Sequence, residues 1–326
     1  MPLLRRDEVF TPRVLARARE LGEVIIPEGT TADLAAQLPA LLPTADACLT
    51  CWGAPMLHPE LLDQAPRLKI IVHAASTIRH IVPIGAFDRG IAISHSANVT
   101  AEAVCEYVLL AMLTGLRRLH LHNAAMHAGA SWADTLAIFP GRQLAGKTVG
   151  LIGCGYVARQ VVALLKPFGV RILTYDPYLS AERAAEIGVE TRPLDDVLRE
   201  SDIISNHAPI TPETRHLIRA RELGLLQDGA IIVNSARAWS IDQDALLAEL
   251  RTGRVWAALD VFEPEPLPED SPFRGLPNVF LSPHRAGFTV ETVEKQGTAA
   301  VEELARFFAG QPLRNQVRRE SYAIMG

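Results

Sequence analysis

The string that most constrains the fold is Gly153-Cys-Gly155-Tyr-Val-Ala158, which directly follows the apolar run Thr148–Ile152. A short apolar run that leads through glycines into a helical pattern predicts a strand-to-helix turn. At such a turn Gly153 permits the tight bend and Gly155 lets the backbone approach a pyrophosphate. The small Ala158 lets the helix pack closely on the strand. The string therefore predicts the first turn of a doubly wound sheet, where phosphates meet a helix N-terminus.

Asp176 ends the next apolar run, Arg171–Tyr175, and adds a second feature to this turn. A carboxylate at that place accepts hydrogen bonds from the two ribose hydroxyls of a dinucleotide and repels a 2′-phosphate. The sequence therefore favours NAD over NADP. Because glycines recur at many turns, a plain βαβ turn with a surface aspartate stays open as the alternative.

Apolar runs and helical patterns alternate along most of the chain, which favours parallel sheets with helices on their faces. In the middle and later part the predicted strands are Thr148–Ile152, Val170–Tyr175, Ile203–His207, Ala230–Asn234, Val255–Val261 and Val279–Ser282. In the first hundred residues they are Glu23–Ile26, Ala47–Trp52, Leu68–Val72 and Ile91–Ser94. The predicted helices cover 31–42, 58–65, 98–119, 156–167, 195–200, 221–226, 241–252 and 290–309.

The predicted fold class is α/β, with two doubly wound domains. A length of 326 residues suits two such units. We expect a Rossmann NAD-binding domain at 99–287, inserted into a smaller flavodoxin-like substrate domain made of residues 1–98 and 288–326.

A long helix from Asn98, with Asn98 and Thr100 as N-cap candidates, joins the two parts, and residues 128–145 should form an irregular connection. The helix and the connection with Trp132 resemble the dimer-forming region of a known protein family, which implies a homodimer, although an intramolecular packing helix is the alternative.

Composition argues against several other classes of protein. There are 32 basic and 37 acidic residues, a balance that does not suit a nucleic-acid-binding protein. The most apolar stretch, Ala103–Leu116, contains Glu106 and is too short to span a bilayer, so no membrane partner is expected. The N-terminus lacks the apolar segment of a signal peptide, which makes the cytoplasm the expected location.

Two clusters could suggest a metal or redox site. Cys48 and Cys51 form a C-x-x-C in a predicted strand, where two half-buried thiols are favoured over a redox dithiol. His120, His122 and His127 lack nearby acidic or cysteine ligands, so we expect no metal there and assign them to a solvated or interface-facing group.

Three polar residues follow predicted strands in the later part of the chain. Open α/β sheets bind their ligands at the carboxyl ends of their strands. The three residues are Arg237 in Val233-Asn-Ser-Ala-Arg237, Glu265 in Asp260-Val-Phe-Glu-Pro-Glu265-Pro, and His284 in Ser282-Pro-His284. Each alone could be a surface arginine, an exposed loop acid or a turn histidine. Together, at the carboxyl ends of strands in a predicted NAD-binding sheet, they indicate a catalytic site.

With these strings, residues 68–309 resemble the D-isomer-specific 2-hydroxyacid dehydrogenase family. The resemblance implies that Arg237 holds the carboxylate and carbonyl of a 2-oxo acid, a task that suits a planar guanidinium. It implies that His284 exchanges a proton with the substrate oxygen and that Glu265, rather than Glu263, orients His284.

The resemblance also places the binding residues. Cofactor contacts are implied for Gly153, Gly155, Tyr156, Val157, Asp176, His207, Ala208, Pro209, Ser235, Ala236, Arg237, Asp260, His284 and Gly287. Asp260 would lie near the nicotinamide carboxamide. Substrate contacts are implied for Trp52, Ala75, Ser76, Thr77, Arg237 and His284, where the 74–77 loop receives the carboxylate.

Two departures from the family pattern bear on the substrate. The usual glycine of the substrate loop is absent from Ala75-Ser76-Thr77, and the usual glycine pair after the arginine is Ala238-Trp239. The expected activity is NAD-dependent interconversion of a small 2-oxo acid and its D-2-hydroxy acid. The alternative is an NAD-responsive scaffold resembling transcriptional co-repressors. Within the enzyme class, a phosphoglycerate dehydrogenase is the less favoured alternative, since no extra regulatory domain is expected after residue 326.

Overall fold

The computed structural model describes residues 4–138 and 140–325. The chain divides into two compact units, Met1–Thr100 with Phe288–Gly326, and Ala101–Gly287. The first boundary lies two residues after the one proposed from the sequence, 100 against 98, and the second coincides with it.

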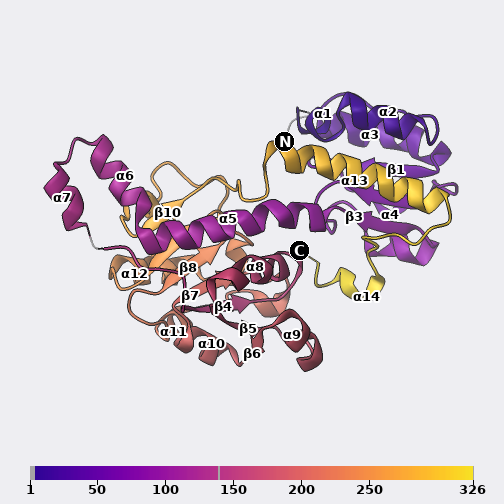
Figure 1. The fold of residues 1–326 in the computed structure, drawn as a ribbon. Coiled ribbons are helices and arrows are strands. Elements are labelled where there is room, and N and C mark those ends of the chain that lie inside the picture. Colours follow the sequence, from indigo (N-terminus) through magenta and orange to yellow (C-terminus); the bar gives the residue numbers. More distant parts are fainter. Residues whose placement is uncertain (1–3, 139, 326) are drawn as a thin grey trace. The chain divides into compact units, whose positions relative to one another are not determined.

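The larger unit is built on a seven-stranded parallel sheet (Figure 1). Its order is β10-β9-β8-β7-β4-β5-β6. The strands are β4 (Thr148–Ile152), β5 (Arg171–Tyr175), β6 (Glu190–Thr191), β7 (Ile203–Asn206), β8 (Ile231–Asn234), β9 (Trp256–Leu259) and β10 (Val279–Leu281). The six predicted strands are present, and the two-residue β6 is an addition. Strand order reverses at β4, so the segments after β4 and β7 meet where such sheets bind ligands.

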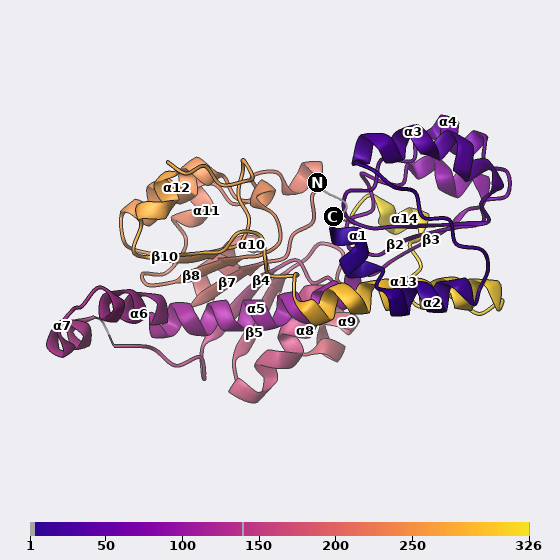
Figure 2. The same ribbon diagram turned by 90° about the horizontal axis from the view of Figure 1, so that it is seen from above.

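Helices cover both faces of this sheet (Figure 2). On one face lie α5 (Ala97–Arg117) and α8 (Tyr156–Leu165), whose buried residues form one core cluster with the strands. On the other lie α10 (Leu194–Glu200), α11 (Ala220–Leu223) and α12 (Gln243–Arg251), which contribute to a second cluster. The sheet is therefore buried on both sides, as its continuous apolar strands require. The short α9 (Ala181–Ile187) precedes β6.

The start and length of α5 differ from expectation. The helix begins at Ala97, whose N–H donates to His95 Nδ1 at 3.1 Å, so Asn98 and Thr100 lie inside the first turn and do not cap it. The α5 helix has 21 residues and contains an 18-residue window with a mean hydropathy of 1.5, so it is long and apolar enough to cross a membrane, contrary to the shorter stretch predicted. Buried core helices share these properties, and 61% of this window is buried within the chain.

The segment after α5 is more helical than predicted. It contains α6 (Leu119–His127) and α7 (Trp132–Ala137), which project from the larger unit (Figure 1). The α7 helix begins after Ser131, whose Oγ accepts from Asp134 N at 3.1 Å as an N-cap. The expectation of an irregular 128–145 connection was therefore wrong for this turn.

The smaller unit has a three-stranded parallel sheet in the order β1-β2-β3. The strands are β1 (Ala47–Thr50), β2 (Ile70–His73) and β3 (Ala92–His95). One core cluster joins this sheet to α1 (Leu4–Val9), α2 (Pro12–Arg19) and α13 (Val290–Phe308), and another lies towards α3 (Thr31–Leu41), α4 (Pro59–Asp63) and α14 (Arg319–Tyr322).

The strand predicted at Glu23–Ile26 is not formed. Pro27, which follows it, has no N–H for a ladder, and its carbonyl accepts from Arg6 Nη1 at 2.8 Å.

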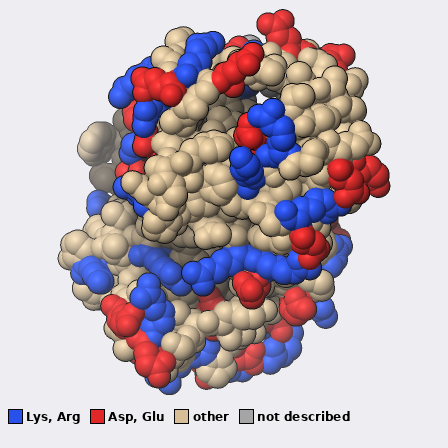
Figure 3. Space-filling model, turned by 90° about the vertical axis from the view of Figure 1, so that its right-hand side faces the viewer, with Lys and Arg blue, Asp and Glu red and all other residues tan. Residues whose placement is uncertain are grey.

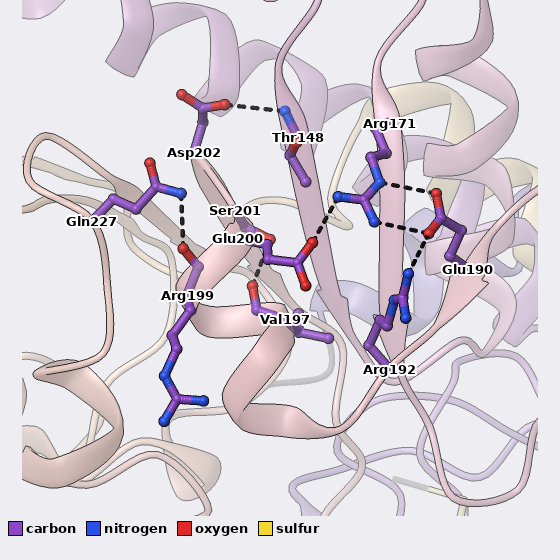
Figure 4. Close-up of polar contacts among 10 residues, drawn as sticks. All are labelled: Thr148, Arg171, Glu190, Arg192, Val197, Arg199, Glu200, Ser201, Asp202 and Gln227. Carbon is purple, nitrogen blue, oxygen red and sulfur yellow. Dashed lines mark hydrogen bonds and ion pairs between the residues drawn. The ribbon is translucent and has the colours of Figure 1, made fainter.

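Ion pairs tie together the amino-terminal edge of the large sheet (Figure 4). Arg171, at the start of β5, pairs with Glu190 of β6 at 2.9 Å and with Glu200 of α10 at 2.7 Å. These side chains are partly exposed, so water screens each pair and its contribution to stability is small. On the face drawn in Figure 3, acidic side chains lie beside basic ones.

Candidate active site

The three predicted catalytic residues follow adjacent strands of the larger unit. Arg237 comes after β8, Glu265 after β9 and His284 after β10. His284 Nδ1 lies 2.8 Å from Glu265 Oε2, and Glu265 Oε1 accepts from the backbone N–H of Phe262 at 2.8 Å. The carboxylate is thus fixed at both oxygens and can hold the imidazole so that Nε2 remains for chemistry.

Arg237 lies within electrostatic reach of this pair. Burial lowers the pKa of Arg237, and the Glu265 carboxylate opposes that effect. Its Nη1 donates to the Ala236 carbonyl at 2.6 Å. The larger unit therefore gathers a guanidinium, a carboxylate and an imidazole at the carboxyl edge of one sheet.

The loop that carries His284 is held by Asp260, which is fully buried. Its carboxylate accepts from Ser282 Oγ, from Arg285 N at 2.8 Å and from Ala286 N at 2.9 Å. Such support matters because His284 has a φ of +53°, an unfavourable conformation for a non-glycine residue. Its predicted place near the nicotinamide carboxamide stays a prediction, because these contacts only fix Asp260 to the loop.

The support extends to Tyr107 of α5, which sequence reasoning missed. Its hydroxyl lies 2.5 Å from Ser282 Oγ, and burial raises the pKa of Tyr107 to about 12. The phenol therefore stays protonated and can act as a neutral hydrogen-bonding group. Tyr107 lies on a helix far along the chain from Ser282, so no local pattern could have revealed the contact.

The glycine turn has the form that a dinucleotide requires. Gly153 has a φ of +89°, and a Cβ there would lie 2.9 Å from the His207 carbonyl oxygen, so only glycine fits. A Cβ on Gly155 would meet nothing within 4 Å, and no side chain caps α8 among the described residues. Ala158 is fully buried against the sheet. The open backbone before a helix N-terminus fits a pyrophosphate.

Asp176 is set beside this turn. Its Oδ2 accepts from Cys154 N at 2.7 Å and its Oδ1 from Tyr178 N at 2.8 Å. A carboxylate oxygen can accept more than one hydrogen bond, so these contacts orient Asp176 and leave it able to receive ribose hydroxyls. Tyr156 and Val157, also predicted to bind the cofactor, form the first turn of α8, where Tyr156 is 44% exposed.

The remaining cofactor residues follow β7, β8 and β10. His207, Ala208 and Pro209 come directly after β7, and His207 Nε2 lies 2.9 Å from Ser205 Oγ. Burial lowers the pKa of His207 to about 4, so its ring is neutral. Ser235 and Ala236 follow β8, and the Ser235 hydroxyl is buried with no partner among the described residues. Gly287 ends the larger unit.

The predicted substrate loop lies in the smaller unit, after β2. Ala75, Ser76 and Thr77 have no positive φ, so the missing glycine causes no backbone strain. The backbone N–H groups of Ala75 and Ser76 donate to no acceptor within the described ranges. Two such N–H groups fit a carboxylate. Trp52 follows β1 and packs against Phe288, with ring centroids 6.2 Å apart.

Buried histidines lie at the same strand ends in this unit. His73 pairs in register with His95, and His73 Nδ1 lies 2.9 Å from Thr50 Oγ1. Burial lowers the pKa of His73 to about 3 and that of His95 to about 4, which keeps both rings neutral. Sequence reasoning missed them because the residues lie on three separate strands.

The departure at Trp239 proves to be a contact between loops. Its Nε1 donates to the Thr211 carbonyl at 2.9 Å, and the Arg215 guanidinium lies 4.3 Å from its ring centroid. The preceding Ala238 is buried. Trp239 thus fastens the segment after β8 to the segment after β7.

The Cys48–Cys51 pair and the histidine group that begins at His120 lie outside the catalytic residues described above. Burial raises the pKa of Cys48 to about 12 and of Cys51 to about 11, so both are unreactive thiols. His120 is partly buried and packs edge-on to Trp256 and Phe280, and its assignment to a solvated or interface-facing group stays a prediction. Within residues 4–138 and 140–325, no three His, Cys, Asp or Glu side chains are grouped to hold a metal.

The chain is similar to known proteins of one enzyme family. A family model described as D-isomer specific 2-hydroxyacid dehydrogenase, NAD binding domain, matches residues 109–286. A glyoxylate reductase of Aeropyrum pernix is 39% identical over 80% of this chain and 79% of that protein. A D-3-phosphoglycerate dehydrogenase of Methanocaldococcus jannaschii is 34% identical over 91% of this chain, which spans 56% of that protein. A crystal structure of a glyoxylate reductase from Paecilomyes thermophila has a TM-score of 0.82 at 26% identity, covering 95% of each chain.

Proposed function

The chain belongs to the D-isomer specific 2-hydroxyacid dehydrogenase family and is an NAD-dependent oxidoreductase of 2-oxo and 2-hydroxy acids; on this premise we propose that it reduces a small, unphosphorylated 2-oxo acid to the D-2-hydroxy acid. The observation that carries the proposal is the Glu265–His284 pair beside Arg237, on the sheet edge that bears the Gly153–Gly155 turn.

In this reaction Arg237 binds the substrate carboxylate and polarises the carbonyl through its forked N–H groups. The bound NADH supplies the hydride that adds to C2. His284 donates the proton that the carbonyl oxygen takes up, which completes the two-electron reduction. Glu265 holds the Nδ1 side of the ring throughout, so the proton is exchanged at Nε2. The reverse reaction uses His284 as the base.

The proposal of a small acid without a phosphate is supported by the surroundings of the substrate loop. Ile78 is fully buried, and the basic residue of the loop, Arg79, donates to the Ala323 carbonyl at 3.2 Å. The relative from Aeropyrum pernix, of which this chain covers 79%, is named glyoxylate reductase. These features favour a short substrate over a phosphorylated one.

The test is a panel of 2-oxo acids assayed by NADH absorbance. Glyoxylate, pyruvate, hydroxypyruvate and phenylpyruvate probe side-chain size, and 3-phosphohydroxypyruvate probes phosphate binding. We expect the highest kcat/KM with a short unphosphorylated acid. A preference for the phosphorylated compound would overturn the substrate assignment. NADH binding without turnover of any acid would favour the scaffold alternative.

We further propose that the protein is a homodimer in the reducing cytoplasm, without nucleic-acid or membrane partners. The support for a dimer is a set of exposed apolar side chains on α6 and α7: Leu119, Met126, Trp132 and Leu136. Trp132 is 72% exposed, and apolar groups of this size that gather on one projection usually meet a partner. The four cysteines are free thiols, which suits a reducing compartment.

A further inference from the structure

We propose that Asn206 and Ser240 are positioning residues for Arg237, because they hold the backbone carbonyl of the residue that binds the substrate carboxylate. The inference rests on the proposed function for the role of Arg237. Neither residue belongs to the sequence strings that indicated the site. Asn206 ends β7, and Ser240 follows Arg237 by three positions.

Asn206 is fully buried and its amide is saturated. Nδ2 donates to Ser240 Oγ at 2.7 Å and to Asn234 Oδ1 at 3.0 Å, and it lies 3.4 Å from the Arg237 carbonyl oxygen. Its Oδ1 accepts from Ala208 N at 3.3 Å. One side chain therefore touches the end of β8, the arginine loop and the cofactor-side loop after β7.

The Arg237 carbonyl receives two further donors. Asn234 Nδ2 lies 3.0 Å away and Ser240 Oγ lies 3.4 Å away. Asn234 Oδ1 also accepts from Ala236 N at 3.2 Å. These bonds form a closed circuit around the turn that begins at Asn234. Because the guanidinium extends from this turn, the circuit sets where its forked N–H groups lie.

Packing alone does not explain why Asn206 and Ser240 are polar residues. Asn206, Asn234 and Ser240 are each at most 1% exposed, and burying such groups is unfavourable unless every one finds a partner. An apolar pair would fill the same space without that requirement. The polar pair adds directionality, and misplacement of a substrate-binding group by about 1 Å can cost about 100-fold in rate.

The chain offers a matched control in Asn278. It is also buried in the larger unit, and its Nδ2 donates to the Leu250 and Val255 carbonyls at 2.8 Å. It precedes β10, so it lies at the opposite edge of the sheet from Arg237. Asn206→Leu and Asn278→Leu each remove a buried amide, but only the first should affect the arginine loop.

Three measurements test the proposal: NADH affinity by fluorescence, affinity of the NADH-loaded protein for oxamate as an unreactive carboxylate probe, and hydrogen–deuterium exchange of the 234–241 peptide. For Asn206→Leu we expect oxamate affinity to fall about tenfold, as loss of one well-placed hydrogen bond implies. KM for the 2-oxo acid should rise likewise and exchange in 234–241 should increase, while NADH affinity should fall less than oxamate affinity, because Asn206 also accepts from Ala208 N of the cofactor-side loop. Asn278→Leu should lower Tm and leave these three values unchanged.

The proposal is overturned if Asn206→Leu lowers Tm as Asn278→Leu does but leaves oxamate affinity and exchange at wild-type values. Should Asn206→Leu not fold, Ser240→Ala removes a single hydroxyl, and wild-type exchange and oxamate affinity there would overturn it equally. If the wild type itself neither binds oxamate nor reduces any acid, the proposed function fails. Exchange in 234–241 still decides whether Asn206 orders the loop.

Discussion

The Nδ1 atom of His284 lies 2.8 Å from Oε2 of Glu265, and the other carboxylate oxygen of Glu265 is held by the N–H of Phe262. The imidazole is therefore oriented by a group that is itself fixed to the backbone. His284 has a φ of +53°, and its loop is held by the buried Asp260. Substitutions at His284 and Glu265 therefore test how the orientation of the imidazole ring contributes to turnover.

Replacing His284 with Ala should lower kcat about 10²–10⁴-fold, because no group remains to donate the proton. Glu265→Gln should also lower kcat, since the amide cannot pair with a charged imidazole. NADH binding, measured by fluorescence, should survive in both variants because the dinucleotide turn is untouched. Wild-type turnover in His284→Ala would contradict the assigned role.

Asp176→Ser should weaken NADH binding and improve NADPH binding, because a carboxylate that accepts ribose hydroxyls also repels a 2′-phosphate. The measurement is kcat/KM with each cofactor at a fixed concentration of the 2-oxo acid. Since Asp176 also accepts from Cys154 N, Tm is needed as a control for loss of the turn. An unchanged cofactor ratio would show that another residue sets the preference.

Gly297→Ala should lower the free energy of unfolding by about 1–3 kcal/mol, as overpacking does. A Cβ at Gly297 of α13 would lie 1.9 Å from the carbonyl oxygen of Val9. This oxygen belongs to the backbone, so it cannot rotate away as a side chain could. Gly22→Ala in the same unit is the control, because a Cβ there meets nothing within 4 Å. Denaturant unfolding of both variants checks the difference, and equal stabilities would contradict the close approach.

Stability should fall as the pH drops from about 6.5 towards 3. The pKa of His73 is lowered by burial from 6.5 to about 3, so within this window the unfolded chain binds a proton that the folded chain excludes. In this window His73 alone changes the free energy of unfolding by about 1.4 kcal/mol per pH unit. Above pH 6.5 the ring is neutral in both states, so His73 no longer makes the free energy of unfolding depend on pH.

His73→Asn should therefore show a shallower decline of Tm between pH 6.5 and 4.5. The exposed His127 provides the control, and His127→Asn should keep the wild-type slope. His95 and His207, whose pKa values are each lowered to about 4, add to that slope in all three proteins. Parallel slopes for wild type and His73→Asn would show that His73 is protonated in the fold.

Trp132→Glu should convert the proposed homodimer to a monomer, because it places a charge on the most exposed large apolar side chain of α7. Light scattering coupled to size exclusion measures the mass. Tyr178→Glu is the control, since Tyr178 is 69% exposed but lies after β5. If the wild-type protein elutes as a monomer, the proposed homodimer is wrong.

Local sequence alone was sufficient for the elements that carry the site. The apolar run before Gly153 and the run before Asp176 became adjacent strands, because short continuous apolar segments between turn residues suit a parallel sheet that is buried on both faces. Sequence reasoning failed where local signals were weak or contradictory. Pro27 left Glu23–Ile26 unpaired, and a cap at Ser131 formed a helix in a segment expected to be irregular.

What the sequence by itself determined is the chemistry available and the place along the chain of the strands that present it: a guanidinium, a carboxylate and an imidazole, each after a strand. What only the tertiary structure decided is how those groups are held. Tyr107 reaches Ser282 from α5, and Asn206 reaches the carbonyl of Arg237 from β7. Such contacts join residues far apart in the chain, and their geometry depends on how sheet and helices pack, which no periodicity in the sequence encodes.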